Sequence, residues 1–158
     1  MLNEALSKYN QAKRKMNLIF FNEAVSYICK ITRILKTERG NALLIGLGGS
    51  GRNSLTNLSA FIRGLSLYSF EISKNYNEQS WKEDLRKLLK QTGAKNTPSY
   101  IFLTDNNILY ESFLEDINNI LNTGEVPNLM LTEDFEEIYN EMRIIVKEKG
   151  LLESPEVM

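Results

Sequence analysis

A glycine-rich stretch at residues 46–54 constrains the fold of this 158-residue chain more than any other part of it. The apolar run 42–45 precedes it and the amphipathic segment 55–62 follows it, which predicts a strand, a loop and the start of a helix. Glycine lets backbone N–H groups approach a ligand closely, and a helix N-terminus adds partial positive charge. The stretch therefore predicts a phosphate-binding loop.

Composition narrows the class of protein. With 42% hydrophobic and 25% charged residues, the chain matches one soluble globular domain. The formal net charge is -1, with both signs mixed along the length, so we expect no binding to nucleic acid or to a membrane surface. No apolar run approaches the roughly 20 residues that span a bilayer, and we expect a protein that stays inside the cell.

The chain has one cysteine and no histidine. Without histidine, the Ser-His-Asp and Cys-His schemes of nucleophilic catalysis and the common zinc sites are excluded. Cys29 has Ile28 and Ile31 beside it on a predicted helix, so we expect a buried, reduced thiol.

Helices and strands alternate in the predicted order of elements. Residues 1–15 are polar and predict a lead-in helix or a frayed end. Apolar spacing predicts strands at 42–45, 68–72 and 100–103, and helices at 16–36, 55–62, 80–93, 113–121 and 132–146. The expected helix caps are Asn22, the pair Ser80 and Glu83, and Thr132. This order predicts an α/β fold, with a parallel sheet and helices on both faces.

Two phosphate-binding patterns overlap in the glycine-rich stretch. The Walker A pattern G-x-x-x-x-G-K-S/T fits at both glycines, but Arg52 and Asn53 stand at its last two positions. Arginine can carry the charge of the missing lysine in a different geometry, and Asn53 or Ser54 could offer an oxygen to Mg²⁺. The dinucleotide pattern G-x-G-x-x-G also fits, with Glu71 twenty residues beyond Gly51, although Glu71 falls inside a predicted strand. A tight turn without a ligand is the third interpretation.

The third predicted strand favours the Walker interpretation. An acidic residue after such a strand holds Mg²⁺ in P-loop NTPases, and Asp105 follows a Walker B-like segment, 101–105. AAA+ proteins usually carry a glutamate next, as the general base that activates water. Here the next residue is Asn106, which cannot take a proton, and a lost general base lowers the rate roughly 10²- to 10⁴-fold.

Longer segments of the sequence resemble those of a known family. They are RGNALLIG at 39–46, GGSGRNSLT at 48–56, EISKNY at 71–76, WKEDL at 81–85 and ESFLEDINNILNTGEVPNL at 111–129. In this order they resemble the fourth AAA+ module in the motor ring of axonemal-type dynein heavy chains, from about residue 16 to 143. The resemblance covers most of the chain and is more specific than either loop pattern.

The resemblance implies a P-loop NTPase (AAA+) fold, with a three-layer arrangement of a parallel sheet and flanking helices. In that fold a sensor strand, a fifth strand and a helical lid follow, and none is recognised after Gly150. We therefore expect an incomplete, front-half module: a polar lead-in at 1–15, a partial AAA+ domain at 16–150 and a tail at 151–158.

For function, the resemblance implies a regulatory module of a microtubule motor that binds ATP or ADP with Mg²⁺ and hydrolyses it weakly or not at all. The expected nucleotide-binding residues are Gly46, Leu47, Gly48, Gly49, Ser50, Gly51, Arg52, Asn53 and Ser54, and the expected metal ligands are Asp105 with Asn53 or Ser54. Expected partners are neighbouring AAA+ modules, the microtubule, and dynein intermediate and light chains, in the cytoskeleton of a cilium or flagellum axoneme. The alternatives are a nucleotide-free structural spacer and a Rossmann-type dinucleotide-binding domain.

Overall fold

The computed structural model describes residues 1–150 and divides them into two units, each considered by itself. Unit 1 comprises Met1–Ser69 and Pro98–Phe102. Unit 2 comprises Phe70–Thr97 and the chain from Leu103 onward. None of the described helices is long and apolar enough to cross a membrane.

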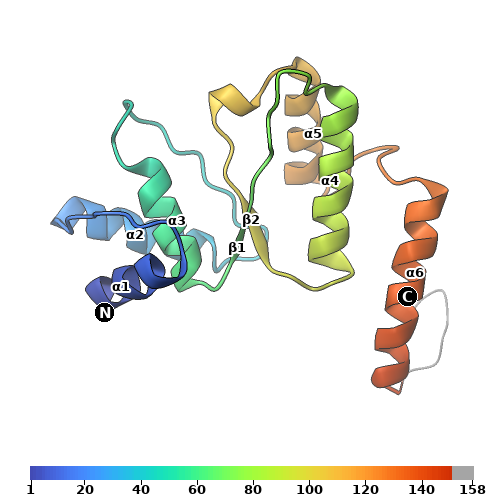
Figure 1. Ribbon diagram of the computed structural model, residues 1–158, viewed down its shortest axis with the longest axis horizontal. Helices are drawn as coiled ribbons and strands as arrows, with labels where there is room; N and C mark the ends of the chain where they lie inside the picture. The colour runs from blue at the N-terminus through green and yellow to red at the C-terminus, as the bar shows by residue number, and fades with distance from the viewer. Residues whose placement is uncertain (151–158) are drawn as a thin grey trace. The chain divides into compact units, whose positions relative to one another are not determined.

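Unit 1 contains three helices and a short parallel pair of strands (Figure 1). Its elements are α1 (Leu2–Ala12), α2 (Asn22–Ile34), α3 (Arg52–Ile62), β1 (Ser66–Tyr68) and β2 (Ser99–Ile101). The strands pair in parallel with Leu67 opposite Tyr100. Within residues 1–15, predicted as a helix or a frayed end, Leu2–Ala12 form the helix α1 and residues 13–15 lie outside it.

The packing of α2 on α3 forms the core of unit 1. Ile28 and Ile31 of α2 and Leu58 of α3 are buried. The buried Ser59 hydroxyl donates to the Leu55 carbonyl at 2.8 Å and lies 3.4 Å from the Ile28 carbonyl, so its polar group is satisfied between the two helices. The rings of Tyr9 and Phe61 make an edge-to-face contact, with their centroids 5.2 Å apart, which packs α1 against α3.

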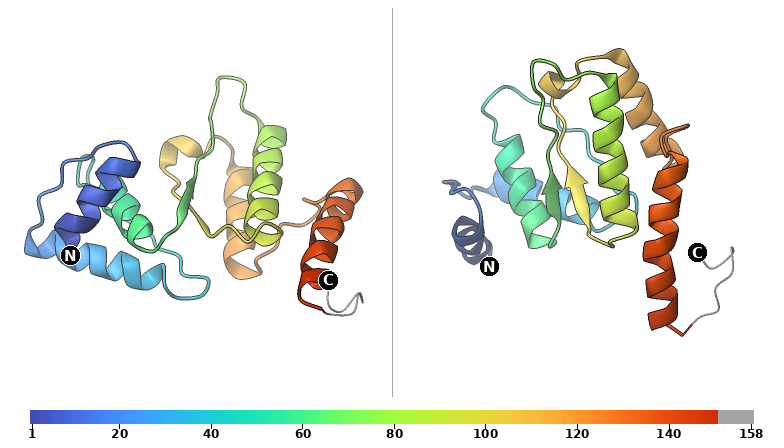
Figure 2. Two further views of the ribbon diagram at one scale, coloured as in Figure 1. Left: turned by 60° about the horizontal axis from the view of Figure 1, so that its bottom comes forward. Right: turned by 45° about the vertical axis from the view of Figure 1, so that its right-hand side comes forward.

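Unit 2 is organised around an aromatic cluster. Its elements are α4 (Glu78–Gly93), the 3-10 turn η1 (Asp105–Asn107), α5 (Glu111–Asn122) and α6 (Thr132–Glu148), and both views of Figure 2 show α4 beside α5. The Trp81 and Phe113 rings stack 4.4 Å apart, with 1% and 0% of these residues exposed. Trp81 Nε1 donates to Asp116 Oδ2 at 3.0 Å, which satisfies the indole where it is buried. These contacts hold α4 against α5.

Charged side chains connect α6 to α4. Lys90 Nζ lies 2.9 Å from Asp134 Oδ1 and 2.6 Å from Glu137 Oε2, and Arg86 lies 3.8 Å from Asp134. The Leu131 amide donates to Asp134 Oδ2 at 2.9 Å. This amide, and then Lys90, lower the pKa of Asp134, while hydrogen bonds to Glu137 and then Asp134 raise the pKa of Lys90.

The predicted strand at 42–45 is absent from the structure. These residues have no regular secondary structure, and Leu43 and Ile45 are 86% and 87% exposed. A strand requires a hydrogen-bonded neighbour, and within residues 1–150 β1 and β2 pair only with each other. The second strand is Ser66–Tyr68, not 68–72, and the third is Ser99–Ile101, not 100–103.

The predicted N-terminal helix caps are wrong in a consistent way. Asn77, not the pair of Ser80 and Glu83, caps α4, because its Oδ1 accepts from the Ser80 amide at 2.9 Å. Asn22 and Thr132 are the first residues inside α2 and α6, so the N-cap positions belong to Phe21 and Leu131. At the start of α6, the Asp134 carboxylate accepts a hydrogen bond from the backbone amide of Leu131. The predicted end of the helix 80–93 is confirmed, because α4 ends at Gly93.

Cys29 is exposed, which corrects the predicted buried thiol. Ile28 is buried as expected, but one residue along a helix turns the side chain by about 100°, so Cys29 leaves the buried face.

The link from α2 toward the glycine-rich loop has no room for a side chain at Gly40. A Cβ there would lie 1.9 Å from the Ile34 carbonyl oxygen and 2.9 Å from the Thr37 oxygen, both backbone atoms. Gly40→Ala should therefore lower the free energy of unfolding by roughly 1–3 kcal/mol, measured by urea denaturation followed by circular dichroism. Gly93→Ala is the control, because its Cβ meets nothing within 4 Å. Equal stability of the two variants would contradict this prediction.

Acid should weaken the attachment of α6. The pKa of Asp134 is lowered on folding from 3.8, so its contribution to stability is present above about pH 4 and is lost as pH falls through the lower folded value. Asp134→Asn should cost about 1 kcal/mol at pH 7, since a cap and an ion pair are lost, and the difference from wild type should shrink between pH 4 and pH 2. Glu136→Gln, on an exposed part of α6, is the control. A difference that is constant with pH would contradict the role of Asp134.

Candidate functional site

The glycine-rich stretch forms an exposed turn that leads into α3. The Ser50 amide donates to the Leu47 carbonyl at 3.2 Å, which closes the turn. Gly49 and Gly51 have φ of 81° and 78°, in the left-handed region that favours glycine. A Cβ added at Gly48 or Gly49 would meet no atom within 4 Å, so the backbone of this turn is open to a ligand.

The first turn of α3 has no cap from a side chain. Its N-cap residue is Gly51, which has no side chain to accept hydrogen bonds from the amides of Arg52, Asn53 and Ser54. These N–H groups and the helix dipole place partial positive charge beside the open turn. An anion such as a phosphate is the natural acceptor for such a helix end.

Arg52 adds a full positive charge at the same place. Its Nη1 lies 3.3 Å from the Leu44 carbonyl and its Nη2 lies 3.4 Å from the Leu47 carbonyl, so the guanidinium folds back along its own loop. A Cβ at Gly46 would lie 3.1 Å from Ser50 Oγ, which is a tight contact, and 3.7 Å from Arg52 Cδ, which is an ordinary one. Both hydrogen bonds are long and go to neutral oxygens, and a phosphate oxygen is a stronger acceptor.

Asn53 belongs to a line of hydrogen bonds that the sequence did not reveal. The Tyr100 hydroxyl donates to Asn57 Oδ1 at 2.6 Å, and Asn57 Nδ2 donates to Asn53 Oδ1 at 2.7 Å. Burial, and then the nearby Tyr9, raise the pKa of Tyr100 to about 12. The spacing of four residues could have indicated Asn57, because such residues share a helix face. No pattern in the sequence indicates Tyr100, which comes from β2.

Asp105 and Asn106 lie in unit 2, whereas residues 46–54 lie in unit 1, and each set is described by itself. Both are exposed members of η1, which begins four residues after β2 ends at Ile101, so Asp105 does not directly follow the strand as expected. Asn107 Oδ1 accepts from the Thr104 amide at 2.9 Å and from its hydroxyl at 2.8 Å, which fixes this turn.

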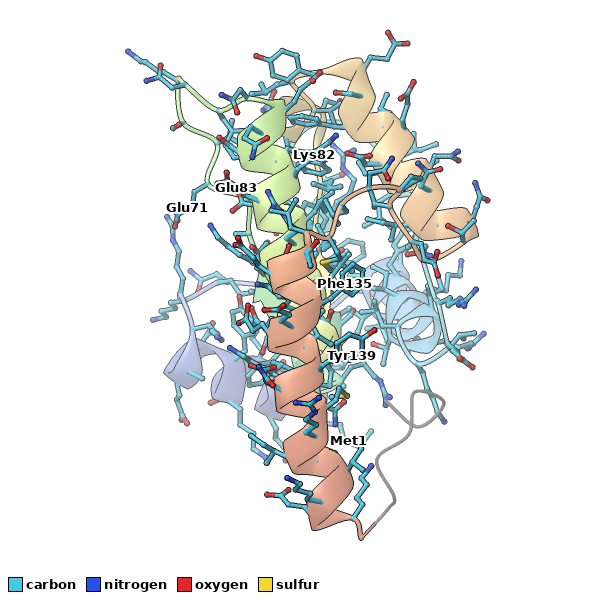
Figure 3. All side chains as sticks on the ribbon, turned by 90° about the vertical axis from the view of Figure 1, so that its right-hand side faces the viewer. Met1, Glu71, Lys82, Glu83, Phe135 and Tyr139 are labelled. Atoms are coloured by element: carbon cyan, nitrogen blue, oxygen red, sulfur yellow. The ribbon has the colours of Figure 1, made fainter. Side chains whose placement is uncertain are left out.

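The groups in the glycine-rich stretch suit a phosphate better than a metal ion. Open backbone amides, an uncapped helix end and a guanidinium are hydrogen-bond donors or positive charges, and these bind a phosphate. For Mg²⁺, the residues that the structure describes contain no cluster of three or more histidine, cysteine, aspartate or glutamate side chains. Glu71, the alternative ribose contact, is exposed and lies in the segment after β1, not within the strand (Figure 3).

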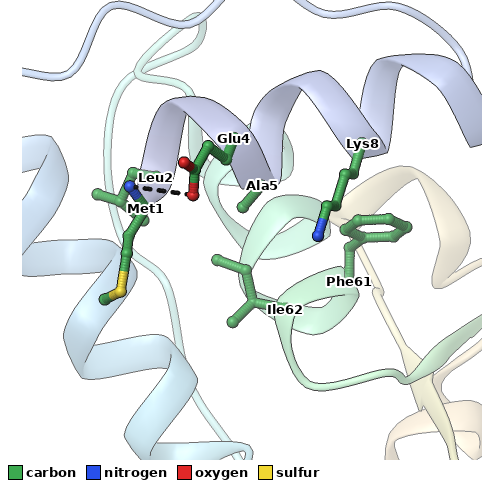
Figure 4. A pocket seen from close by; sticks show the side chains of 7 residues that line it. All are labelled: Met1, Leu2, Glu4, Ala5, Lys8, Phe61 and Ile62. Atoms are coloured by element: carbon green, nitrogen blue, oxygen red, sulfur yellow. Dashed lines mark ion pairs between the residues drawn. The ribbon is translucent and has the colours of Figure 1, made fainter.

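Two surface hollows lie among residues outside the glycine-rich stretch. One, of about 400 Å³, lies between α1 and α3 and is lined by Met1, Leu2, Glu4, Ala5, Lys8, Phe61 and Ile62 (Figure 4). The Met1 amino group pairs with Glu4 at 3.5 Å beside it. The other, of about 240 Å³, lies on α6 and is lined by Glu136, Tyr139, Asn140 and Arg143. Neither hollow includes a residue predicted to bind nucleotide.

Comparison with known proteins gives a match over most of the chain. Residues 16–158 match the family described as P-loop containing dynein motor region D4. The chain is 44% identical over 152 residues to dynein axonemal heavy chain 1 of Rattus norvegicus, covering 96% of this chain and 3% of that protein. It is 42% identical over 160 residues to the dynein-1-beta heavy chain of the flagellar inner arm I1 complex of Chlamydomonas reinhardtii, covering 100% of this chain and 4% of that protein. The chain thus spans about 3 to 4% of the length of these relatives.

Proposed function

Since the chain belongs to the dynein heavy chain family, within the P-loop containing motor region D4, we propose that residues 46–54 bind ATP or ADP. The observation that carries this proposal is the uncapped N-terminus of α3 behind an open glycine turn. Its amides have no side-chain acceptor, and a terminal phosphate would satisfy them. Arg52 starts in the same turn and can exchange two neutral carbonyls for phosphate oxygens.

Each residue of the loop has a role in this proposal. The amides from Leu47 to Arg52 hold the phosphates, Gly46 leaves room for the Ser50 hydroxyl, and Arg52 neutralises charge. Asn53 or Ser54 and, from the sequence pattern, Asp105 are the proposed ligands of Mg²⁺. When bound, Mg²⁺ neutralises part of the charge of the phosphates.

We further propose that the site regulates the motor and hydrolyses ATP weakly or not at all. Asn106 stands where a general base is expected, and a carboxamide does not accept a proton at neutral pH. A site that binds nucleotide without turning it over can still hold one conformation of its module, because a ligand stabilises the state that it binds better.

For the whole protein, the proposal follows the relatives. Their names place them in axonemes and in a flagellar inner arm complex, and we propose the same location for this protein. The proposed partners are the neighbouring AAA+ modules of the heavy chain, the microtubule, and dynein intermediate and light chains.

In the complete motor region, we propose the three-layer AAA+ fold, with residues 42–45 as an additional parallel strand. Leu43, Ile45 and Leu47 alternate along an extended segment and are 86%, 87% and 86% exposed. Apolar side chains at every second position are typical of a strand with a buried face. This part of the sheet would support the loop from its N-terminal side.

A nucleotide-free spacer is the second candidate, and one observation favours it. The bonds from Arg52 to the Leu44 and Leu47 carbonyls brace the loop without any ligand. The Rossmann-type alternative through Glu71 has no comparable support, since the family that matches is a P-loop family.

Nucleotide titration separates the two candidates. ATP and ADP, but not NAD, should raise the melting temperature of the chain, and Arg52→Ala should weaken ADP binding roughly 10- to 150-fold, because a hydrogen bond to a charged group contributes about 1.5–3 kcal/mol. Arg63→Ala, at the other end of α3, is the matched control and should bind like wild type. If neither ATP nor ADP changes the melting temperature, the spacer is the better description.

Turnover tests the role of Asn106. ATP hydrolysis should stay near the background rate, and Asn106→Ala should not change it, because the amide transfers no proton. A coupled phosphate-release assay measures both, with ADP binding as the check that the variant is folded. A turnover comparable to that of an intact AAA+ site would contradict the proposed weak hydrolysis, and its loss in Asn106→Ala would show that Asn106 takes part in catalysis.

A further inference from the structure

A short line of hydrogen bonds joins β2 to the nucleotide-binding end of α3. It runs from the Tyr100 hydroxyl to Asn57 and from Asn57 to Asn53, over distances of 2.6 and 2.7 Å. Asn57 is half-buried and Asn53 is exposed in the first turn of α3, next to the amides proposed to hold phosphate. The inner end of the line is therefore sheltered, and its outer end lies in the exposed first turn of α3.

The phenol determines the direction of the whole line. A carboxamide can act as donor or acceptor at either end, but the half-buried Tyr100 hydroxyl has one proton that needs an acceptor. Asn57 Oδ1 is that acceptor, so Asn57 Nδ2 must point outward and donate to Asn53 Oδ1. A phenol keeps its proton at neutral pH even at its ordinary pKa, and burial raises the pKa of Tyr100 further, to about 12.

The consequence lies at Asn53. Its carbonyl oxygen accepts from Asn57, which occupies one lone pair, while its Nδ2 group keeps two N–H donors. Donors of this kind suit a phosphate oxygen and cannot ligate a cation. Asn53 therefore fits a phosphate better than Mg²⁺ in this geometry.

We propose that Tyr100 and Asn57 are positioning residues that orient Asn53 to donate to a nucleotide phosphate, which leaves Ser54 as the loop residue that faces the metal. This inference rests on the proposed function and refines it. It predicts that residues 46–54 recognise the phosphates of ADP even without Mg²⁺.

Replacing the carboxamide of Asn53 with a carboxylate tests which group faces the ligand. Calorimetric titration with ADP, once with Mg²⁺ and once with a chelator, should show at least 10-fold weaker binding by Asn53→Asp in both conditions, because a carboxylate repels phosphate. If Asn53 is instead a metal ligand, Asn53→Asp should strengthen the binding of ADP in Mg²⁺, and the inference is overturned. Asn3→Asp, exposed on α1, controls for the added charge.

Removing the phenol proton tests the positioning residues. Tyr100→Phe keeps the ring, so the melting temperature should change little, while the side-chain NH₂ signals of Asn53 and Asn57 shift in the ¹⁵N spectrum and ADP affinity without Mg²⁺ falls about 3- to 10-fold. Tyr9→Phe, which keeps the ring contact with Phe61, should leave the NH₂ signals and the ADP affinity unchanged. Unchanged NH₂ signals and affinity in Tyr100→Phe overturn the inference, whereas a wild-type chain that binds neither ATP nor ADP overturns the proposed function itself.

Discussion

The packing of α3 against α2 is the contact on which the candidate site depends. Helix α3 carries the amides proposed to bind phosphate at one end, and its buried residues Leu58 and Ser59 lie further along the same helix. Ser59 is held by a hydrogen bond within α3 and lies against a carbonyl of α2, so the helix is fixed by apolar burial and by a satisfied polar group together. A loop can be open and exposed while the helix behind it stays in place.

The second unit shows a different source of order. Its core is a stack of aromatic rings with the Trp81 indole bonded to Asp116, and the attachment of α6 relies on charges around Lys90 and Asp134. Aromatic burial is insensitive to pH, whereas the ion pairs are not. Phe135 and Tyr139, exposed one turn apart on α6 and labelled in Figure 3, leave part of that helix apolar toward solvent.

Local patterns in the sequence predicted the helices and the loop better than the strands. Helical spacing located α3 to α6 within a few residues, because each helix forms its own hydrogen bonds. Strand 42–45 failed because its partners are set by the whole sheet, which no local pattern contains. The family was predicted from longer phrases and is confirmed by the match over residues 16–158. At the site, residues 46–54 follow from the glycines, but the line from Tyr100 to Asn53 joins residues far apart in sequence and could not be read from it.

The exposed apolar segment before the loop has a consequence for ligand affinity. Residues 42–45 lead directly into the turn, and nothing among residues 1–150 pairs with them as a strand. Fixing a residue's backbone costs roughly 1–2 kcal/mol of conformational entropy. A neighbour that covers Leu43 and Ile45 would order the segment in advance, so burial of this segment and the proposed binding of nucleotide in the loop would favour each other through conformational entropy.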